Sequence, residues 1–432
     1  MVIRIGSKGI DMMKSTLLTN ALLIDGTGRA AVRGASVLVE GQAIKQVSAT
    51  PIEVSPKIEC IDLRGRALLP GLMDAHVHVV ITGDIAELLS GGGFPPAVMH
   101  SIQIKEALEK TLAAGFTTVR DAGGANQEVR EAVEQGYING PRLLLSCAML
   151  SQTGGHGDFV PSHRDGEYGL PSWGVGTPAA ICDGVPDVIK ATRQQLKNGA
   201  DWIKVMAGGG VMSPRGSLEA VQFTPDELRA IVDVAKSAGK EVMAHCHSAA
   251  AIRHAVLAGV RTIEHGTFIT QELIELMAEK KCALMPTLTL MNAFDPAEGG
   301  ANLPETQKRK MVEVVARAGE CLRLAMTNRD KIQIGSATDA FGGAMQGKNG
   351  HELVFKTQMG LSPMEAIVSA TRVNAEIFGL ADKLGTITEG KWADMIVVDG
   401  NPLEDVQLFA QPDKVVLIMK EGKIVKDLLR SA

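Results

Sequence analysis

Short apolar runs separated by turn signals dominate both ends of the chain. Asp25-Gly26 and Arg64-Gly65 interrupt the runs near the N-terminus, and Glu421-Gly422-Lys423 gives a hairpin signal near the C-terminus. Such runs predict β-strands. Each end is too short to bury a stable core alone, so we expect both to pack together as one small β-sandwich. The predicted strands are residues 17–24, 36–40, 43–47, 58–62, 395–398 and 415–420.

The middle of the chain alternates helix-period segments with short apolar runs. Residues 225–238, for example, have the helical period and precede the apolar run 241–245. Repeated βα units predict a parallel sheet, and eight units over roughly 300 residues favour a (β/α)8 TIM barrel over an open sheet. The expected barrel strands are residues 68–78, 116–120, 142–146, 202–206, 241–245, 261–264, 283–288 and 331–335.

These patterns predict an α/β protein with two domains. Residues 1–70 and 385–432 would form the two parts of the β-sandwich, and residues 71–384 the barrel. Met13 is an alternative start to Met1, since the first strand-like run begins just after it.

Composition narrows the class of protein further. The chain has 432 residues, of which 45% are hydrophobic and 22% charged, which is typical of a globular protein. Its net charge of −5 offers no basic excess for nucleic acid, so we expect no such partner. No apolar run approaches the roughly 20 residues that span a bilayer, and no signal peptide is recognisable. The six cysteines form no C-x-x-C pair, which indicates reduced thiols. We therefore expect a cytoplasmic protein without a membrane partner.

Chemistry-bearing residues gather at the expected C-terminal ends of the barrel strands, where enzymes of this fold place catalytic groups. His76 and His78 share one face of the first strand because side chains alternate along a strand, and two such imidazoles can hold one metal ion. Lys204 lies inside an apolar run, where an unpaired ammonium is costly unless its stem reaches solvent. Other strand ends add His245, His247, His265 and Asp339.

The pattern of residues at the strand ends resembles the amidohydrolase superfamily. It consists of the H-x-H pair, the lysine of strand four, the histidines of strands five and six and the aspartate of strand eight. Residues 70–74, which precede the H-x-H pair, and the tail motif 385–403 extend the resemblance over nearly the whole chain. Locally the chain is similar to the branch of prolidases, Xaa-Arg carboxypeptidases and imidazolonepropionase-like enzymes. Residues 115–124, 152–156 and 263–266 carry that similarity.

The resemblance implies a two-metal site, with zinc as the expected ion. A neutral lysine amine can add CO2, and the anionic carbamate suits a bridge between two cations. His, carboxylate and carbamate ligands also suit Mn, Co or Fe. A one-metal site without the carbamate is the alternative, although Lys204 favours two ions. The implied ligands are His76, His78 and Asp339 on one ion, His245 and His265 on the other, and carboxylated Lys204 between them.

The same resemblance implies that a hydroxide shared by the ions attacks an amide carbonyl, with Asp339 moving the proton to the leaving amine. His156 follows the third strand and would contact the substrate or a metal ligand. His247 would polarise the scissile carbonyl or line the wall. Arg215 would pair with a substrate carboxylate or lie in solvent.

The predicted activity is cleavage of the C–N amide bond of a dipeptide or N-acyl amino acid, with a small-molecule amide as substrate. The first alternative is a hydrolase of a cyclic amide, a urea or an aryl amide, of the imidazolonepropionase, phenylurea or ochratoxin type. A non-catalytic structural relative is a remote third reading, because such a protein would be expected to lose ligands. We expect a homo-oligomer.

Overall fold

The computed structural model describes residues 15–83, 95–158, 175–213, 216–293, 303–343 and 345–430. The alternative start at Met13 lies outside this part of the chain. Within it, no helix has both the length and the apolar character needed to cross a membrane.

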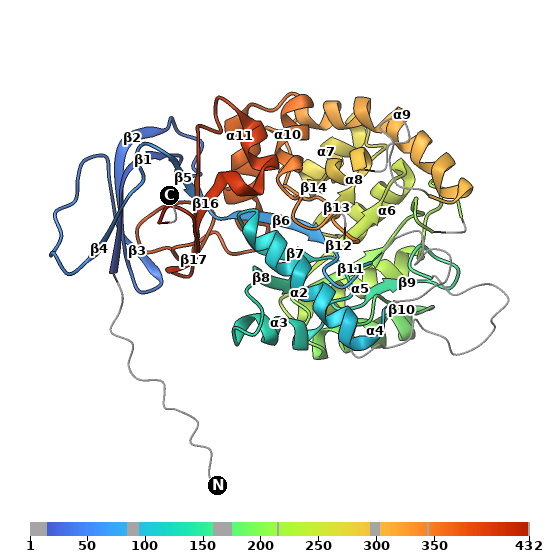
Figure 1. Ribbon diagram of the computed structural model, residues 1–432. Helices are drawn as coiled ribbons and strands as arrows, with labels where there is room; N and C mark the ends of the chain where they lie inside the picture. The colour runs from blue at the N-terminus through green and yellow to red at the C-terminus, as the bar shows by residue number, and fades with distance from the viewer. Residues whose placement is uncertain are drawn as a thin grey trace, which may run out of the picture.

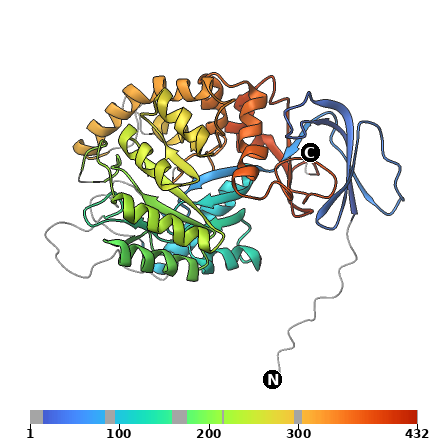
Figure 2. The same ribbon diagram turned by 180° about the vertical axis from the view of Figure 1, so that it is seen from behind.

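Both ends of the chain contribute to one eight-stranded sheet, which lies at one end of the molecule beside the helical body (Figures 1 and 2). The centre of this sheet is β1, which pairs antiparallel with β2 and parallel with β4 and β5. β15 pairs antiparallel with β5 and so joins the C-terminal hairpin to the N-terminal strands. The strands are β1 (Ser15–Leu23), β2 (Val32–Glu40), β3 (Ala43–Ser48), β4 (Glu59–Asp62), β5 (Ala67–Pro70), β15 (Met395–Val398), β16 (Val415–Lys420) and β17 (Lys423–Asp427).

The interior of this sheet is apolar and draws on both chain ends. Leu18 and Val37 from the first strands pack in one buried cluster with Met395 and Leu417 from the last strands. Removing such side chains from water is the main stabilising term in folding. Neither end could bury this surface alone, which explains why the two ends meet.

Parallel strands with intervening helices form the rest of the protein. They belong to a three-stranded sheet, β6-β7-β8, and a six-stranded sheet, β10-β9-β11-β12-β13-β14. The strands are β6 (Leu72–Val77), β7 (Phe116–Asp121), β8 (Arg142–Leu145), β9 (Met149–Ser151), β10 (Ala179–Ile181), β11 (Trp202–Met206), β12 (Glu241–Cys246), β13 (Thr262–His265) and β14 (Ala283–Met285). Two of them, β9 and β10, are absent from the sequence prediction. The α/β class is confirmed.

Helices cover the outside of these sheets. α5 illustrates how the sequence encodes them: the Thr224 side chain caps the first turn in a capping box with Glu227, and Leu228 and Ile231 face the core. The helices are α2 (Ala97–Ala113), α3 (Gln127–Glu134), α4 (Val185–Lys197), α5 (Pro225–Ser237), α6 (Ala249–Ala258), α7 (Gln271–Glu279), α8 (Leu288–Ala293), α9 (Glu305–Thr327), α10 (His351–Gln358), α11 (Pro363–Val368) and α12 (Asn374–Ile377), with a π-helical turn at Ser369–Val373.

Backbone hydrogen bonds pass between the two parallel sheets in two places. The Asp201 N–H donates to Leu145 O at 2.7 Å, which links the start of β11 to β8. On the other side, residues 333–340 run between β14 and β6: the Leu284 N–H donates to Gln333 O at 2.9 Å, and the Asp339 N–H donates to His76 O at 2.7 Å.

The predicted eighth strand, 331–335, is reduced to isolated bridges of Ile334 with Leu284 and of Ala340 with Val77. Just beyond it, side chains bind the backbone. The Ser336 N–H donates to Asn374 Oδ1 at 3.0 Å, and the Thr338 N–H donates to Asp74 Oδ1 at 3.1 Å. The apolar run predicted a regular strand, because no local pattern shows that the N–H groups after it bond to side chains.

The predicted first barrel strand, 68–78, is broken at Gly71, so that β5 and β6 belong to different sheets. A Cβ atom on Gly71 would lie 2.2 Å from Thr117 Oγ1 on β7 and 2.9 Å from Thr117 Cβ. The missing side chain therefore lets the chain cross closely over β7 as it passes between the sheets.

We expect Gly71→Ala to destabilise the protein by about 1–3 kcal/mol, because the added methyl group overpacks a buried site next to a stiff β-branched side chain. Calorimetric unfolding would measure the loss. Gly319→Ala is the matched control, because Gly319 lies inside α9 and its added Cβ would meet only the Arg323 side-chain tip, at 3.3 Å. A Gly71→Ala protein as stable as that control would contradict the close-crossing argument.

Candidate active site

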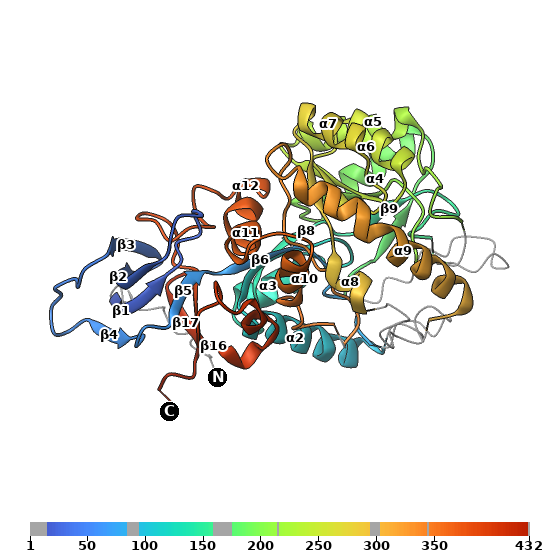
Figure 3. The same ribbon diagram turned by 90° about the horizontal axis from the view of Figure 1, so that it is seen from above.

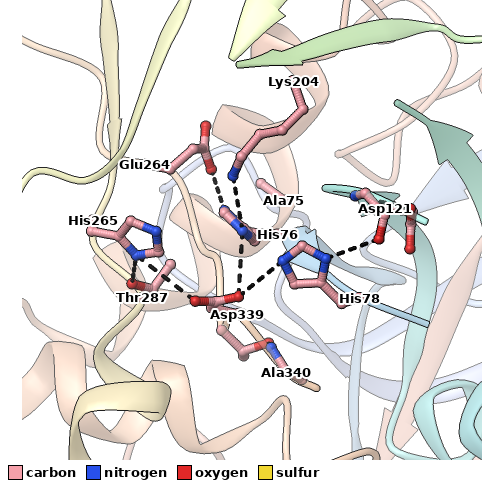
Figure 4. A network of polar contacts seen from close by, with 12 residues as sticks. Ala75, His76, His78, Asp121, Lys204, Glu264, His265, Thr287, Asp339 and Ala340 are labelled. Carbon is pink, nitrogen blue, oxygen red and sulfur yellow. Dashed lines mark hydrogen bonds and ion pairs between the residues drawn. The ribbon is translucent and has the colours of Figure 1, made fainter. Parts of the chain in front are cut away.

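His76 and His78 each use one ring nitrogen for a structural contact and direct the other toward Asp339 (Figure 4). His76 Nδ1 lies 2.6 Å from Glu264 Oε2, and its Nε2 lies 3.4 Å from Asp339 Oδ1. His78 Nδ1 lies 3.0 Å from Gly123 O, and its Nε2 lies 3.3 Å from Asp339 Oδ1. Such outer contacts fix the ring orientation and the tautomer of histidines that bind metal.

Lys204 reaches the same point from β11 and is 1% exposed. Its Nζ lies 3.3 Å from His76 Nε2. Burial lowers the pKa of Lys204 to about 8, although Glu264 and Asp339 act in the opposite direction. A larger fraction of the Lys204 amine is therefore neutral than for a lysine in water.

His265 and His245 complete the group from β13 and β12. His265 Nδ1 lies 2.8 Å from Thr287 Oγ1 and 3.9 Å from Asp339 Oδ2. The ligand atoms of His76, His265 and Asp339 all lie within 4.8 Å of one another. The His245 ring centroid lies 4.5 Å from that of His265, and its Nε2 lies 3.2 Å from Gly209 O.

The electrostatics of this group favour neutral imidazoles beside a charged carboxylate. Burial, and then neighbouring histidines, hold the pKa of His245 and of His265 well below the usual value. Burial alone would raise the pKa of Asp339, but His76 and His78 together hold it below its usual value. Neutral imidazole and ionised carboxylate are the forms that bind metal ions.

Two of these residues and one supporting residue have left-handed backbone conformations that side chains rarely adopt. The φ angle is +69° at His265, +56° at Asp339 and +51° at Thr287. Such conformations cost free energy and cluster at functional sites.

Glu264 and Arg120 support the site, and the sequence analysis assigned neither a role. Both side chains are fully buried, and Arg120 Nη2 donates to Glu264 Oε1 at 3.0 Å. Burial raises the pKa of Glu264, but Arg120 and His76 outweigh it and bring the pKa to about 2. Arg120 Nε also donates to Ala75 O at 2.7 Å. The signal available in the sequence was one basic and one acidic residue inside two short predicted strands.

Two further buried aspartates hold the backbone around the site. Asp121 accepts hydrogen bonds from the Val79, Gly123 and Ala125 N–H groups at 3.0–3.1 Å. Asp74 accepts a hydrogen bond from Thr338 Oγ1 at 2.6 Å and so holds the residue that precedes Asp339. Burial raises the pKa of Asp74 to about 6.

The structure also places the predicted substrate-contacting residues. His156 is buried, and its ring centroid lies 4.3 Å from that of His245. The backbone N–H of His156 donates to Gln222 Oε1 at 3.0 Å. His247 Nδ1 lies 2.6 Å from Thr267 Oγ1, and its ring stacks on His265 at 5.0 Å. Arg215, the third of these residues, lies outside the described part of the chain.

Comparison with known proteins identifies the family of this chain. Residues 67–425 match the amidohydrolase family model. The chain belongs to the amidohydrolase family. It is thus a hydrolytic enzyme that acts on C–N bonds, as the sequence resemblance implied.

Named relatives cover almost the whole chain. The ochratoxinase of Aspergillus niger is 33% identical over 96% of this chain and 88% of its own length. A prolidase solved in complex with N-methylphosphonate-L-proline is 35% identical, with a TM-score of 0.90 over 96% of this chain and all of that chain. A Xaa-Pro dipeptidase with methionine in its active site is 32% identical, with a TM-score of 0.85 over the same shares.

We expect Arg120→Met to destabilise the protein by about 3–5 kcal/mol, because it leaves the Glu264 carboxylate buried without its cation. Arg120→Met/Glu264→Gln should recover part of that loss. Urea unfolding would measure both. The loss should shrink as the pH falls, because Glu264 takes up a proton once its low pKa is no longer maintained.

Arg317→Met is the control for this experiment, because Arg317 forms exposed ion pairs with Glu219 and Glu313. It should change stability by less than about 1 kcal/mol. Equal effects of the two arginine substitutions would refute the role assigned to Arg120.

Proposed function

We propose that this chain is a binuclear metal-dependent amidohydrolase that cleaves the C–N amide bond of a dipeptide or an N-acyl amino acid. The observation that carries the proposal is the convergence of His76 Nε2 and His78 Nε2 on the Asp339 carboxylate, with Lys204 Nζ against His76 Nε2 and with His265 and His245 alongside. A closed (β/α)8 barrel and a β-sandwich of both chain ends are part of the same proposal.

The donor set fits two divalent ions. His76, His78 and Asp339 would hold one ion, and His245 and His265 would hold the other. Lys204, carboxylated by CO2, would bridge the two. When bound, two such ions supply a hydroxide at neutral pH and polarise a carbonyl oxygen. Zinc is our expected ion.

The chain's own residues would position the substrate and move protons. Asp339 would take the proton of the attacking group and give it to the leaving amine. His247, whose Nδ1 is held by Thr267, can present its other nitrogen to the scissile carbonyl. We propose His156 as a wall of the substrate pocket, and Arg215 keeps its proposed pairing with a substrate carboxylate.

Two relatives support a linear substrate with a free carboxylate: the prolidase complex and the Xaa-Pro dipeptidase. The ochratoxinase relative favours an aryl amide as the second candidate, because it aligns with 96% of this chain. Cyclic amides and ureas stay as test outcomes, whereas the non-catalytic reading is set aside because the chain belongs to a family of hydrolytic enzymes. The cytoplasmic location and the homo-oligomer also stay predictions.

A substrate panel tests the reaction class. The protein, prepared with zinc and bicarbonate, would be offered dipeptides, N-acyl amino acids, aryl amides and cyclic ureas, with products read by mass spectrometry. We expect free C-terminal amino acids to be released, and Asp339→Asn to stop the release by removing the proton acceptor. Turnover confined to cyclic ureas would overturn the linear-amide proposal, and silence on the whole panel would overturn it by placing the substrate outside these classes.

Reconstitution tests the bridging role of Lys204. After chelation, we expect zinc with bicarbonate to restore about two ions per chain by elemental analysis, and zinc without CO2 to restore fewer. Lys204→Met should lose hydrolysis by roughly a thousandfold or more, because the bridge and one anionic charge disappear. Lys308→Met, a lysine at the start of α9, is the control. Full metal content and activity in Lys204→Met would rule out the bridge.

A further inference from the structure

Lys310 on α9 is a charged residue beside the site that the proposed mechanism does not use. α9 packs beside α8, the helix that follows β14 (Figure 3). Lys310 Nζ donates to Gly210 O at 3.3 Å and to Ser213 O at 3.0 Å. The ammonium is therefore held at the loop that follows β11, the strand that carries Lys204.

That loop is in direct contact with the candidate metal centre. Gly209 O lies 3.2 Å from His245 Nε2. The next residue, Gly210, packs so closely on His156 that an added Cβ would lie 2.2 Å from His156 Cε1. The Lys310 ammonium is thus bound to the same short loop segment that contacts both His156 and His245.

The position of Lys310 in the fold places its charge on the same side as these histidines. The loop that it holds follows the C-terminal end of β11, and His156 and His247 follow the C-terminal ends of β9 and β12. Parallel α/β sheets bind their substrates at the carboxyl ends of the strands. The half-buried Lys310 ammonium therefore lies at the substrate side of the sheet.

We propose that Lys310 determines specificity by binding the free carboxylate of the substrate. The inference rests on the proposed function and adds a second cation to the one proposed there, Arg215. The amide bond would lie at Asp339 and His247, and the carboxylate would reach the loop end held by Lys310. A lysine ammonium is a flexible point charge with three N–H donors. It can therefore keep its hydrogen bond to a carbonyl and donate another to a carboxylate. The favoured substrates are amides whose leaving amine is an α-amino acid.

The test compares Lys310→Met with wild type on matched pairs: an N-acyl amino acid and the same compound with its carboxylate converted to a carboxamide. We expect kcat/KM for the carboxylate to fall by about 10- to 100-fold, mainly through KM, because a charge-assisted hydrogen bond is lost. The carboxamide should change little. Lys310→Arg should keep much of the preference, since it retains the charge.

Arg309→Met, the exposed neighbour on α9, is the control and should leave both substrates unaffected. The ratio of the two kcat/KM values does not depend on the folded fraction, so a partly unfolded variant still gives a valid answer. Equal losses on both members of a pair would show that Lys310 only tethers the loop, and would overturn the inference.

Direct binding separates this inference from the proposed function. Calorimetric titration of the zinc-loaded protein with the N-acyl amino acid and with its carboxamide needs no turnover. If wild type binds the carboxylate more tightly and Lys310→Met does not, the inference holds even when hydrolysis fails. If wild type binds both compounds equally, the inference fails whatever the protein hydrolyses.

Discussion

The buried contact between Glu264 and His76 is the interaction on which the site depends. Glu264 belongs to β13 in the six-stranded sheet, and His76 to β6 in the three-stranded sheet, so their 2.6 Å contact joins the two sheets across the interior. An unpaired carboxylate could not be buried there. Arg120, from β7, supplies the compensating charge and also binds the backbone of β6. Charge balance and ring orientation are therefore achieved by the same three side chains.

A common local arrangement orients the remaining imidazoles. His247 contacts Thr267, which lies beyond the end of the next strand along the chain, and His265 contacts Thr287 in the same way. His78 contacts the Gly123 carbonyl, again from beyond the following strand. Each ring is thus fixed by the neighbouring βα unit, and its other nitrogen is left for the shared centre. Parallel strands make this possible because their carboxyl ends lie side by side.

The loop after β11 connects this centre to His156 and to Lys310 on α9. Its glycines allow His156 to pack against Gly210 and let the Gly209 carbonyl reach His245. Lys310 holds the loop from α9, more than ninety residues further along the chain. Side chains from different parts of the fold therefore meet at one short segment, which contacts His156, His245 and Lys310.

The sequence by itself determined the class of fold, the βα alternation and the strand ends that carry histidine, lysine and aspartate. These depend on local periodicity and on residue types whose burial needs an explanation, such as Lys204. Tertiary structure alone decided which buried charges meet. Arg120 and Glu264 are separated by 144 residues, and no local pattern encodes their pairing. Tertiary contacts also decided the break at Gly71, which is set by Thr117. They reduced the predicted strand 331–335 to isolated bridges, and just beyond it Asn374 and Asp74 bind the N–H groups of Ser336 and Thr338. Local patterns report what a residue prefers, whereas its partner depends on how distant segments pack.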